Sequence, residues 1–450
     1  MENALISLPS AVLAVMNALE EAGYSAYVVG GCVRDALRGV APHDFDVTTS
    51  ARPEEMMKAF SAFRVIPTGI EHGTLTVLSD GIPVEVTAYR VDGAYKDGRH
   101  PLSVTFTNDL RKDAARRDFT VNAMAWSPTR GLQDFFGGQE DLKAGIIRTV
   151  GNPKARFTED ALRILRALRF ASVLGYTIDI GTKQAAFDLR ETLSKISAER
   201  IREEFIKLLC GKDAVKILRE YFPVICVFLP ALSPMKGFAQ NTPWHNSNVW
   251  EHTLRVLDAI PPMPPLRLAA LFHDAGKPSV YSEDEKGVGH FYGHGKASVS
   301  IAEEALTALK TDNKLKNHVL TLVEYHDRKP ENSDKAIRRL LAKLGEEAFF
   351  DLLELWRADC IGQAPMAQER LPLITHIRKR AEEICKESPC LTLRDLAIDG
   401  IALAEIGYAR GPRMGDCLKT LLSLVIDGEL ENNPAVLTAY AKKQLKGENQ

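Results

Sequence analysis

Three carboxylates near the start of the chain have the types and spacing of a divalent-cation site. Asp44 and Asp46 are separated by one residue, and Glu85 stands between two valines in an apolar run over 83–89. On a strand, positions i and i+2 share a face, so the two aspartates would repel each other unless a cation lay between them. Carboxylate oxygens are ligands that Mg²⁺ prefers. An isolated Asp-x-Asp pair is more often a solvated turn, so neighbouring motifs are needed to decide.

A glycine pair upstream of the aspartates is suited to binding a phosphate. Gly30 and Gly31 stand where an expected strand over 27–29 turns into a short helix over 33–37. Glycine lets the backbone approach an anion closely, and a helix N-terminus directs N–H groups toward it. Arg34 adds a forked donor. A plain tight turn has the same pattern, but together with the acidic cluster this turn predicts a phosphate and metal site.

Four motifs occur in the order found in one family. They are Gly30-Gly31-x-x-Arg34-Asp35 with Asp44-x-Asp46; Arg116-Arg117-Asp118-Phe119-Thr120-x-Asn122-Ala123-Met124; Gly145-x-Ile147-Arg148-x-Val150-Gly151; and Arg156-Phe157-x-Glu159-Asp160-x-x-Arg163-x-x-Arg166. Across about residues 25–210 the chain resembles class II bacterial tRNA nucleotidyltransferases, the CCA-adding enzyme and poly(A) polymerase family. These belong to the polymerase-β-like nucleotidyltransferase superfamily.

The resemblance implies an activity and a set of site residues. The activity is template-independent addition of C and A, from CTP and ATP, to the 3′ end of tRNA. Asp44, Asp46 and Glu85 would be catalytic, and the two aspartates would hold Mg²⁺ ions about 3.5–4 Å apart. The nucleotide-binding set would be Gly30, Gly31, Arg34, Arg116, Arg117, Asp118, Asn122, Asp160, Arg163 and Arg166. The arginines suit a triphosphate, and Asp118 suits a ribose hydroxyl.

Base choice is expected to depend on Asp160 and Arg163, three residues apart on a helix predicted over 158–174. A carboxylate accepts from the exocyclic amine of cytosine or adenine and repels the carbonyl of uracil or guanine. The simpler interpretation is a surface ion pair on a helix that Thr158 caps. Between Arg148 and Arg169 six basic residues face two acidic ones, which makes this segment a candidate RNA-binding surface. The polar loop 90–101 resembles the family's flexible loop for A addition.

The C-terminal half has a second set of ligand-type side chains. His273 and Asp274 close the apolar run 268–272, and His252 and Asp359 lie on helical patterns far from them in sequence. A buried carboxylate beside an imidazole needs a partner, and a metal is a common one. The order His, His-Asp, Asp resembles the HD phosphohydrolase superfamily, in which these four residues would bind a divalent transition metal. His294 and His326 are further candidate ligands or phosphate contacts.

The pattern of elements predicts an α+β protein. An N-terminal α/β head (1–150) is followed by helical modules: a neck (151–238) with helices over 158–174, 197–210 and 212–220, an HD module (239–365) and a tRNA-binding tail (366–450). In the head we expect a helix over 8–22, a strand over 44–47, and a hairpin of 75–78 with 83–89 around Asp80-Gly81.

Composition restricts the protein's class. Among 450 residues 45% are hydrophobic and the net charge is −2, so RNA contacts must come from local basic surfaces. Seven cysteines without a Cys-x-x-Cys pair predict neither a disulfide framework nor a cysteine zinc site. No signal peptide, membrane span or obligate protein partner is expected, which predicts a cytoplasmic protein with tRNA, ATP and CTP as partners.

Three other functions remain open at this level. An A-adding enzyme or a poly(A) polymerase would share every motif of the head. A phosphohydrolase acting through the HD site on RNA ends or nucleotides would use the head only to position RNA. An RNA-binding protein without catalysis would not need two intact sets of metal ligands.

Overall fold

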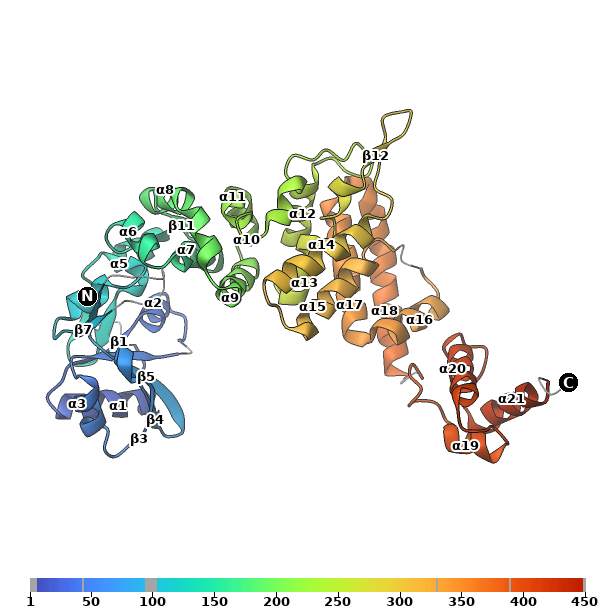
Figure 1. Ribbon diagram of the computed structural model, residues 1–450, viewed down its shortest axis with the longest axis horizontal. Coiled ribbons are helices and arrows are strands. Elements are labelled where there is room, and N and C mark those ends of the chain that lie inside the picture. The colour runs from blue at the N-terminus through green and yellow to red at the C-terminus, as the bar shows by residue number, and fades with distance from the viewer. Residues whose placement is uncertain (1–5, 43, 94–102, 329–330, 388–389, 448–450) are drawn as a thin grey trace. The chain divides into compact units, whose positions relative to one another are not determined.

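The computed structural model describes residues 6–42, 44–93, 103–328, 331–387 and 390–447. The chain forms two compact units, Met1–Pro230 and Ala231–Gln450, both drawn in Figure 1. An α+β fold, with a sheet in the N-terminal head and a mostly helical remainder, is confirmed.

The head contains a seven-stranded mixed sheet with the strand order β3-β4-β5-β2-β1-β8-β9. Only β2 and β5 pair in parallel; the other neighbours are antiparallel. The strands are β1 (Ala26–Val29), β2 (Asp46–Thr49), β3 (Arg64–Gly69), β4 (Thr74–Ser79), β5 (Ile82–Ala88), β8 (Ala125–Ser127) and β9 (Gly131–Gln133). A separate two-stranded ladder joins β6 (Arg90–Asp92) to β7 (Val104–Phe106).

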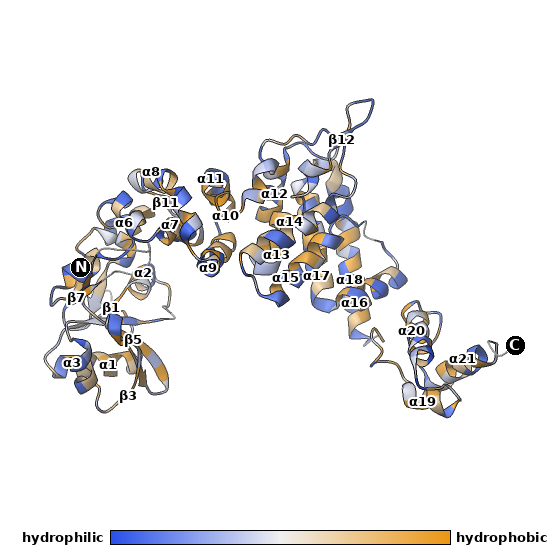
Figure 2. Ribbon diagram, viewed as in Figure 1, coloured by the Kyte–Doolittle hydropathy of each residue, from blue (hydrophilic) through white to orange (hydrophobic). Residues whose placement is uncertain are grey.

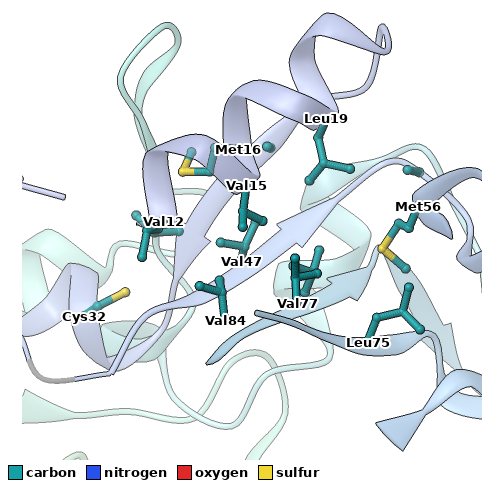
Figure 3. Close-up of a cluster of buried hydrophobic side chains, with 14 of the residues drawn as sticks. Val12, Val15, Met16, Leu19, Cys32, Val47, Met56, Leu75, Val77 and Val84 are labelled. Carbon is teal, nitrogen blue, oxygen red and sulfur yellow. The ribbon is translucent and has the colours of Figure 1, made fainter. Parts of the chain in front are cut away.

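One face of this sheet is covered by α1 (Ser10–Glu21) and α3 (Pro53–Ala59). Figure 3 shows Val12, Val15, Met16 and Leu19 of α1 directed toward valines and Leu75 of the strands. Because side chains alternate along a strand, the neighbours of these core residues point to the opposite face. Glu85 lies between buried Val84 and Val86 and is exposed. The polar face of the sheet is therefore the one available for chemistry.

The hairpin predicted around Asp80-Gly81 is present. Ser79 pairs with Ile82, and both turn residues have positive φ, 49° for Asp80 and 77° for Gly81. A two-residue hairpin of this type needs φ above zero at both positions, which Asp-Gly supplies at low cost.

The remaining α-helices described in this unit have between 4 and 13 residues. They are α2 (Gly31–Leu37), α4 (Leu110–Ala115), α5 (Gly138–Ala144), α6 (Pro153–Glu159), α7 (Leu162–Leu174), α8 (Ile180–Asp188), α9 (Ala198–Leu209), α10 (Ala214–Glu220) and α11 (Phe222–Ile225). A parallel ladder of β10 (Ile146–Ile147) with β11 (Thr177–Ile178) lies among them.

The continuous helix predicted over 158–174 is wrong. The chain breaks at Asp160, whose backbone is extended with φ −144° and ψ 105°, so α6 ends there and α7 begins afresh. The Asp160 carboxylate accepts from the backbone N–H of Leu162 at 3.0 Å and thereby caps the new helix. Thr158 is not a cap, because its hydroxyl donates to the Lys154 carbonyl inside α6.

The second unit is built from helices and one two-stranded ladder, β12 (Ser282–Glu283) with β13 (Gly289–His290). Its helices are α12 (Val249–Ala259), α13 (Pro264–Phe272), α14 (His294–Ala308), α15 (Asn313–Tyr325), α16 (Asp334–Leu344), α17 (Glu346–Gly362), α18 (Leu371–Lys386), α19 (Gly400–Glu405), α20 (Pro412–Ile426) and α21 (Pro434–Gly447). Figure 2 shows hydrophobic and hydrophilic residues alternating around these helices, as expected for amphipathic packing. In the described part of the chain, no helix has the length and apolar character that crossing a membrane requires.

Candidate active site and candidate metal centre

A cleft of about 740 Å³ lies on the first unit and gathers most of the residues predicted for the head. Eight basic and six acidic side chains line it. The basic ones are Arg34, Arg116, Arg117, Arg163, Arg166, Arg169, Arg200 and Lys207; the acidic ones are Asp35, Asp44, Asp46, Asp118, Asp160 and Glu204. Gly30, Gly31 and Asn122 also line the cleft. The structure therefore brings together the predicted phosphate, metal and base-contacting residues, with Glu85 as the exception.

The three predicted carboxylates lie on or beside the central strands. The strand begins at Asp46, so Asp44 lies in the preceding loop and the expected strand over 44–47 is wrong by two residues. Both aspartates nevertheless line the same cleft. Glu85 is in register with Asp46 on the adjacent parallel strand, which places its side chain on the same face of the sheet.

Electrostatics favour a cation at this position. Desolvation within the cleft raises the pKa of Asp46 above its ordinary value, the Arg117 guanidinium opposes this, and the charge of Asp44 adds to it. A raised carboxylate pKa means that the ionised form lacks full compensation from the protein. Oxygen ligands carrying excess negative charge fit a hard divalent cation such as Mg²⁺.

The glycine turn has the geometry expected of a close backbone approach. Gly30 has φ 78° and ψ −131°, a conformation that residues with a Cβ rarely adopt, and it precedes the first turn of α2. Arg34 on that helix is buried and does not extend into solvent. Its guanidinium donates to the Asn122 side-chain carbonyl at 2.8 Å and to both oxygens of Asp35. Arg34 thus links the turn to the segment that carries Asn122.

Arg116 and Arg117 follow α4 and share one buried anchor, Asp113. This carboxylate is fully buried and accepts from Arg116 at 2.8 Å and from Arg117 at 3.4 Å. It also accepts from the Thr48 hydroxyl on β2 at 3.3 Å. A single carboxylate therefore fixes two cleft arginines relative to the strand that carries Asp46.

Buried Asp118 and half-buried Arg166 form an ion pair in the cleft. The Arg166 guanidinium donates twice to one Asp118 oxygen, at 2.8 and 2.6 Å. The other oxygen accepts from the Phe119 backbone and the Asn122 amide. Burial raises the pKa of Asp118, but Arg166 outweighs it and holds the pKa below its ordinary value. Asp118 is therefore a charged, rigidly held acceptor.

The predicted pair of Asp160 with Arg163 does not form. Asp160 instead accepts from Arg200 on α9 at 2.8 Å. Arg163 donates to Glu159 at 2.6 Å and to the Arg116 backbone carbonyl at 3.2 Å. The break after α6 turns Asp160 away from the helical position that sequence spacing assigned to it. Both side chains still line the cleft. A carboxylate and a guanidinium each have more hydrogen-bonding positions than these contacts use.

The basic segment 148–169 is internally compensated. All six of its basic side chains lie within 4 Å of a carboxylate: Arg148 with Asp141 and Asp179, Lys154 with Asp188, Arg156 and Arg163 with Glu159, Arg166 with Asp118 and Glu204, and Arg169 with Glu204. Its local positive charge is thus smaller than the sequence indicates. Of the predicted loop over 90–101, residues 94–101 lie outside the described residues; β6 and β7 flank that segment.

In the second unit six candidate ligands from different helices converge. His252 lies on α12, His273 and Asp274 directly follow α13, His294 begins α14, His326 directly follows α15, and Asp359 lies on α17. Two groups with ligand atoms within 4.8 Å of one another share Asp274: His252 with His273, and His294 with His326. Asp359 joins the first group, 3.0 Å from His252 Nε2.

Hydrogen bonds to the backbone fix the orientation of three of these imidazoles. The Nδ1 atoms of His273, His294 and His326 each face a backbone carbonyl three residues earlier, at 2.7–2.9 Å. A ring that donates from Nδ1 presents an Nε2 lone pair when it is neutral. The Nε2 atoms of His294 and His326 are 3.1 Å apart, and those of His252 and His273 are 3.2 Å apart. Because His294 and His326 both donate from Nδ1, their facing Nε2 lone pairs need a positive charge between them, and these residues therefore fit a metal.

Charges around Asp274 support the same conclusion. Asp274 is 2% exposed, and Lys277 contacts it at 2.7 Å. Burial raises the pKa of Asp274, but His273 and Lys277 outweigh it and hold the pKa well below its ordinary value. Burial lowers the pKa of His252, but Asp274 and Asp359 reverse this and raise it to about 9. The carboxylates therefore favour positive charge at this position.

A second cavity, here called the metal pocket, opens beside these ligands and measures about 730 Å³. Asp274, His294, His326 and Asp359 line it. The half-exposed Trp244 and the exposed Tyr292 add flat apolar surfaces, and Arg370 and Lys277 add positive charge. A molecule with a phosphate and an apolar planar group matches this lining.

Four residues that matter to these sites were missed from sequence: Asp113, Arg200, Glu204 and Lys277. Asp113 precedes Arg116 and Arg117 by three and four residues, a helical spacing that signals contact. Lys277 likewise follows Asp274 by three residues. Arg200 lies 40 residues from Asp160 and no local pattern connects the two.

Family models match three parts of the chain. Residues 26–148 match the poly A polymerase head domain, residues 175–222 a probable RNA and SrmB-binding site of polymerase A, and residues 296–441 tRNA nucleotidyltransferase domain 2. None of these three matches is to an HD-domain model.

Relatives and solved structures match nearly the whole chain. A CCA-adding enzyme of Lactobacillus delbrueckii subsp. bulgaricus is 33% identical over 439 residues, 95% of this chain and 96% of that one. A crystal structure of the Bacillus stearothermophilus CCA-adding enzyme in complex with CTP has a TM-score of 0.72 and 30% identity, covering 100% of this chain and 99% of that one. The Thermotoga maritima CCA-adding enzyme complexed with tRNA, 20% identical with a TM-score of 0.58 over 97% and 96% of the chains, shares the fold.

Proposed function

The chain belongs to the family of CCA-adding enzymes, and we propose on this premise that it adds C and A from CTP and ATP to the 3′ end of tRNA without a nucleic-acid template. The observation that carries the proposal is the cleft of the first unit, which is lined by the paired carboxylates Asp44 and Asp46 and by seven arginines. Relatives that match almost the whole length of the chain are CCA-adding enzymes, and one with 30% identity was solved with CTP.

The reaction joins the tRNA 3′ oxygen to the α-phosphorus of the nucleotide and breaks the bond to pyrophosphate. Asp44 and Asp46 would hold divalent cations, with Glu85 beside Asp46 on the same face. Such cations, when bound, neutralise the charge that develops on the phosphates and acidify the attacking hydroxyl. Arg116 and Arg117 would contact the triphosphate in positions fixed by Asp113. Because phosphoryl transfer requires mainly positioning and charge neutralisation, these contacts account for much of the catalysis.

Base selection would use the cleft side chains of Asp160 and Arg163. Arg200 holds the Asp160 carboxylate in place at 2.8 Å, and a carboxylate accepts from the exocyclic amine that only C and A present. Arg163 donates to ring acceptors of the base. Its hydrogen bonds to Glu159 and to the Arg116 backbone carbonyl keep the guanidinium close to the arginines that would contact the triphosphate.

The test of this function uses Asp44→Ala and Asp46→Ala with Glu54→Ala as a matched control, an exposed acid of α3 that does not line the cleft. Extension of a tRNA lacking CCA should be lost in both cleft variants and kept in the control, because losing a metal ligand removes several kcal/mol of transition-state stabilisation. Near-normal extension by either cleft variant at saturating Mg²⁺ would refute the assignment.

A second function is favoured by the six converging ligands of the second unit, for which we propose a phosphohydrolase centre of the HD type. A mixed imidazole and carboxylate set suits Ni²⁺, Mn²⁺ or Fe²⁺. A metal of this kind, when bound, supplies positive charge to a phosphate and acidifies water. Lys277 and the Asp274 carboxylate provide further polar contacts at the metal pocket. The substrate class is a 2′,3′-cyclic phosphate or a phosphomonoester.

The two functions can be separated by reciprocal variants. The double change His273→Ala and Asp274→Ala should abolish hydrolysis of a cyclic nucleotide and leave CCA addition intact, and Asp44→Ala should do the reverse. A purified protein that retains no metal after supplementation and hydrolyses none of these esters would make the second unit a structural or RNA-binding module.

A further inference from the structure

Another cavity on the same unit, lined by four basic residues, adjoins the metal pocket. It measures about 360 Å³, and Arg328, Lys335, Arg339 and Lys343 line it together with one acidic residue, Glu331, and with apolar side chains of α16, α17 and α18. We call these four residues and their cavity the basic groove. Arg328 and Trp356 line both the basic groove and the metal pocket. The two cavities therefore share a wall and form adjoining parts of one surface.

Two of the four basic side chains form no ion pair with an acidic residue in the described part of the chain. Lys335 and Arg339 contact Asp427 at 3.1 and 2.6 Å. Within the described residues, no carboxylate lies within 4 Å of Arg328 or Lys343, and both side chains are exposed. Their positive charge is therefore available to an anion.

The two uncompensated cations are positioned by one aromatic ring. The Arg328 guanidinium lies 4.0 Å, and the Lys343 ammonium 5.2 Å, from the centre of the Tyr325 ring. Tyr325 is 2% exposed and directly precedes the candidate ligand His326. Cation–π contact restrains both charges, and two like charges near one ring are stabilised further by an anion that bridges them.

Arg328 and Trp356, the two residues that line both cavities, are also connected to the candidate ligand His326. The Trp356 indole donates from Nε1 to the backbone carbonyl of His326 at 2.8 Å. Arg328 follows His326 by two residues. An anion bound by Arg328 is thus next to the position where a phosphate ester would meet the ligands.

We propose that the basic groove holds backbone phosphates of single-stranded RNA, so that the 3′-terminal phosphate ester of the strand enters the metal pocket. The inference rests on the phosphohydrolase function proposed above and names its substrate as an RNA end in preference to a free nucleotide. In the reaction water adds across one P–O bond of a terminal 2′,3′-cyclic phosphate. The water oxygen bonds to phosphorus, and a proton ends on the ribose oxygen that leaves.

RNA fits this surface better than an acidic polypeptide does. Both ligands would satisfy Arg328 and Lys343, but only RNA also carries a phosphate ester for the adjoining ligands. The metal pocket presents exposed Trp244 and Tyr292, flat surfaces on which bases stack regardless of sequence. Phosphate contacts in the groove and stacking in the pocket together describe a single-strand binding path.

The test compares two substrates with the same reacting group: a nucleoside 2′,3′-cyclic phosphate and a short oligoribonucleotide that ends in one. Full-length protein supplemented with Ni²⁺ or Mn²⁺ is assayed as wild type, as Arg328→Glu with Lys343→Glu, and as Lys314→Glu with Lys419→Glu. The last variant is a control with the same change in net charge, at exposed residues of α15 and α20 outside both cavities.

We expect the wild type to have a higher kcat/KM for the oligoribonucleotide than for the cyclic nucleotide. In the groove variant the ratio of the two values should fall roughly tenfold or more, because each charged hydrogen bond to phosphate contributes at least that factor. The slope of log(kcat/KM) against log salt for the oligoribonucleotide should fall by about 1.4, the value for two phosphates of a single strand. The control variant should match the wild type in both respects.

Four results would contradict the inference or the function on which it rests. Equal kcat/KM for the two substrates in the wild type, or equal losses for both in the groove variant, would show that the groove does not bind the strand. Inhibition by polyglutamate as strong as that by an unreactive RNA of equal charge would assign the groove to acidic polypeptides. Failure to hydrolyse even the cyclic nucleotide would contradict the phosphohydrolase function itself.

Discussion

Asp113 is the side chain whose loss should reveal most about how the cleft is held together. It is fully buried, and it anchors Arg116 at 2.8 Å and Arg117 at 3.4 Å. Asp113→Asn keeps the shape but removes the charge, which leaves two guanidinium groups without their counterion. Breaking a buried pair in this way costs about 3–5 kcal/mol. The two arginine side chains are 18% and 19% exposed to the cleft, so we expect a value near 2–3 kcal/mol, somewhat below that range.

The assay is differential scanning calorimetry with nucleotide KM measured in parallel. A change of 1 kcal/mol shifts Tm by about 2–4 °C for a unit of this size, so the transition that contains the head should fall by roughly 4–12 °C. KM for CTP and ATP should rise because the triphosphate contacts are no longer fixed in place. Asp188→Asn is the control: Asp188 also pairs with a basic residue, Lys154 at 2.7 Å, but on the surface. A Tm and KM of Asp113→Asn that match those of Asp188→Asn would refute the reasoning.

Three further outcomes are expected. Asp160→Ala should lower the ratio of C and A incorporation to U and G incorporation by about tenfold to a hundredfold, since each discriminating contact is worth about 1–3 kcal/mol; an unchanged ratio in competition assays would make Asp160 a helix cap alone. Deleting residues 92–101 should leave tRNA ending in CC as the product when both nucleotides are supplied, and equal loss of C and A addition on a sequencing gel would contradict this. Asp118→Asn should destabilise the head at neutral pH; because Arg166 holds the folded pKa of Asp118 below its ordinary value, this stability is present above about pH 4 and is lost as pH falls through the folded pKa. Acid unfolding curves of the two proteins should therefore converge at low pH, and curves that stay parallel would exclude the pair.

Elements with a local signal were predictable from the sequence. The alternation around Asp80-Gly81 specified a hairpin that the structure contains, because only a few residues support two positive φ angles in succession. The position of Glu85 on the polar face followed from the valines on either side. The His-Asp pair at the end of an apolar helix was equally readable, since a buried carboxylate beside an imidazole requires a partner.

Long-range partners were beyond sequence reasoning. Spacing alone placed Asp160 on a helix with Arg163, but the backbone is extended at Asp160, and its carboxylate accepts from Arg200 on another helix. The same limit applies to the basic segment 148–169, whose charges are compensated by acids as distant as Glu204. Helical periodicity describes neighbours within about one turn, and it contains no information on which side chain packs across from another element.

The most direct test of the central proposal is to read product lengths from defined tRNA ends. Wild-type protein is offered tRNA that ends before CC, after CC and after CCA, with CTP, ATP or both. Template-independent CCA addition predicts three added nucleotides, one added A and no addition, respectively, when both nucleotides are present. Addition of A only after CC would indicate an A-adding enzyme, and a long A tail on the completed end would indicate a poly(A) polymerase; either result would contradict the proposal.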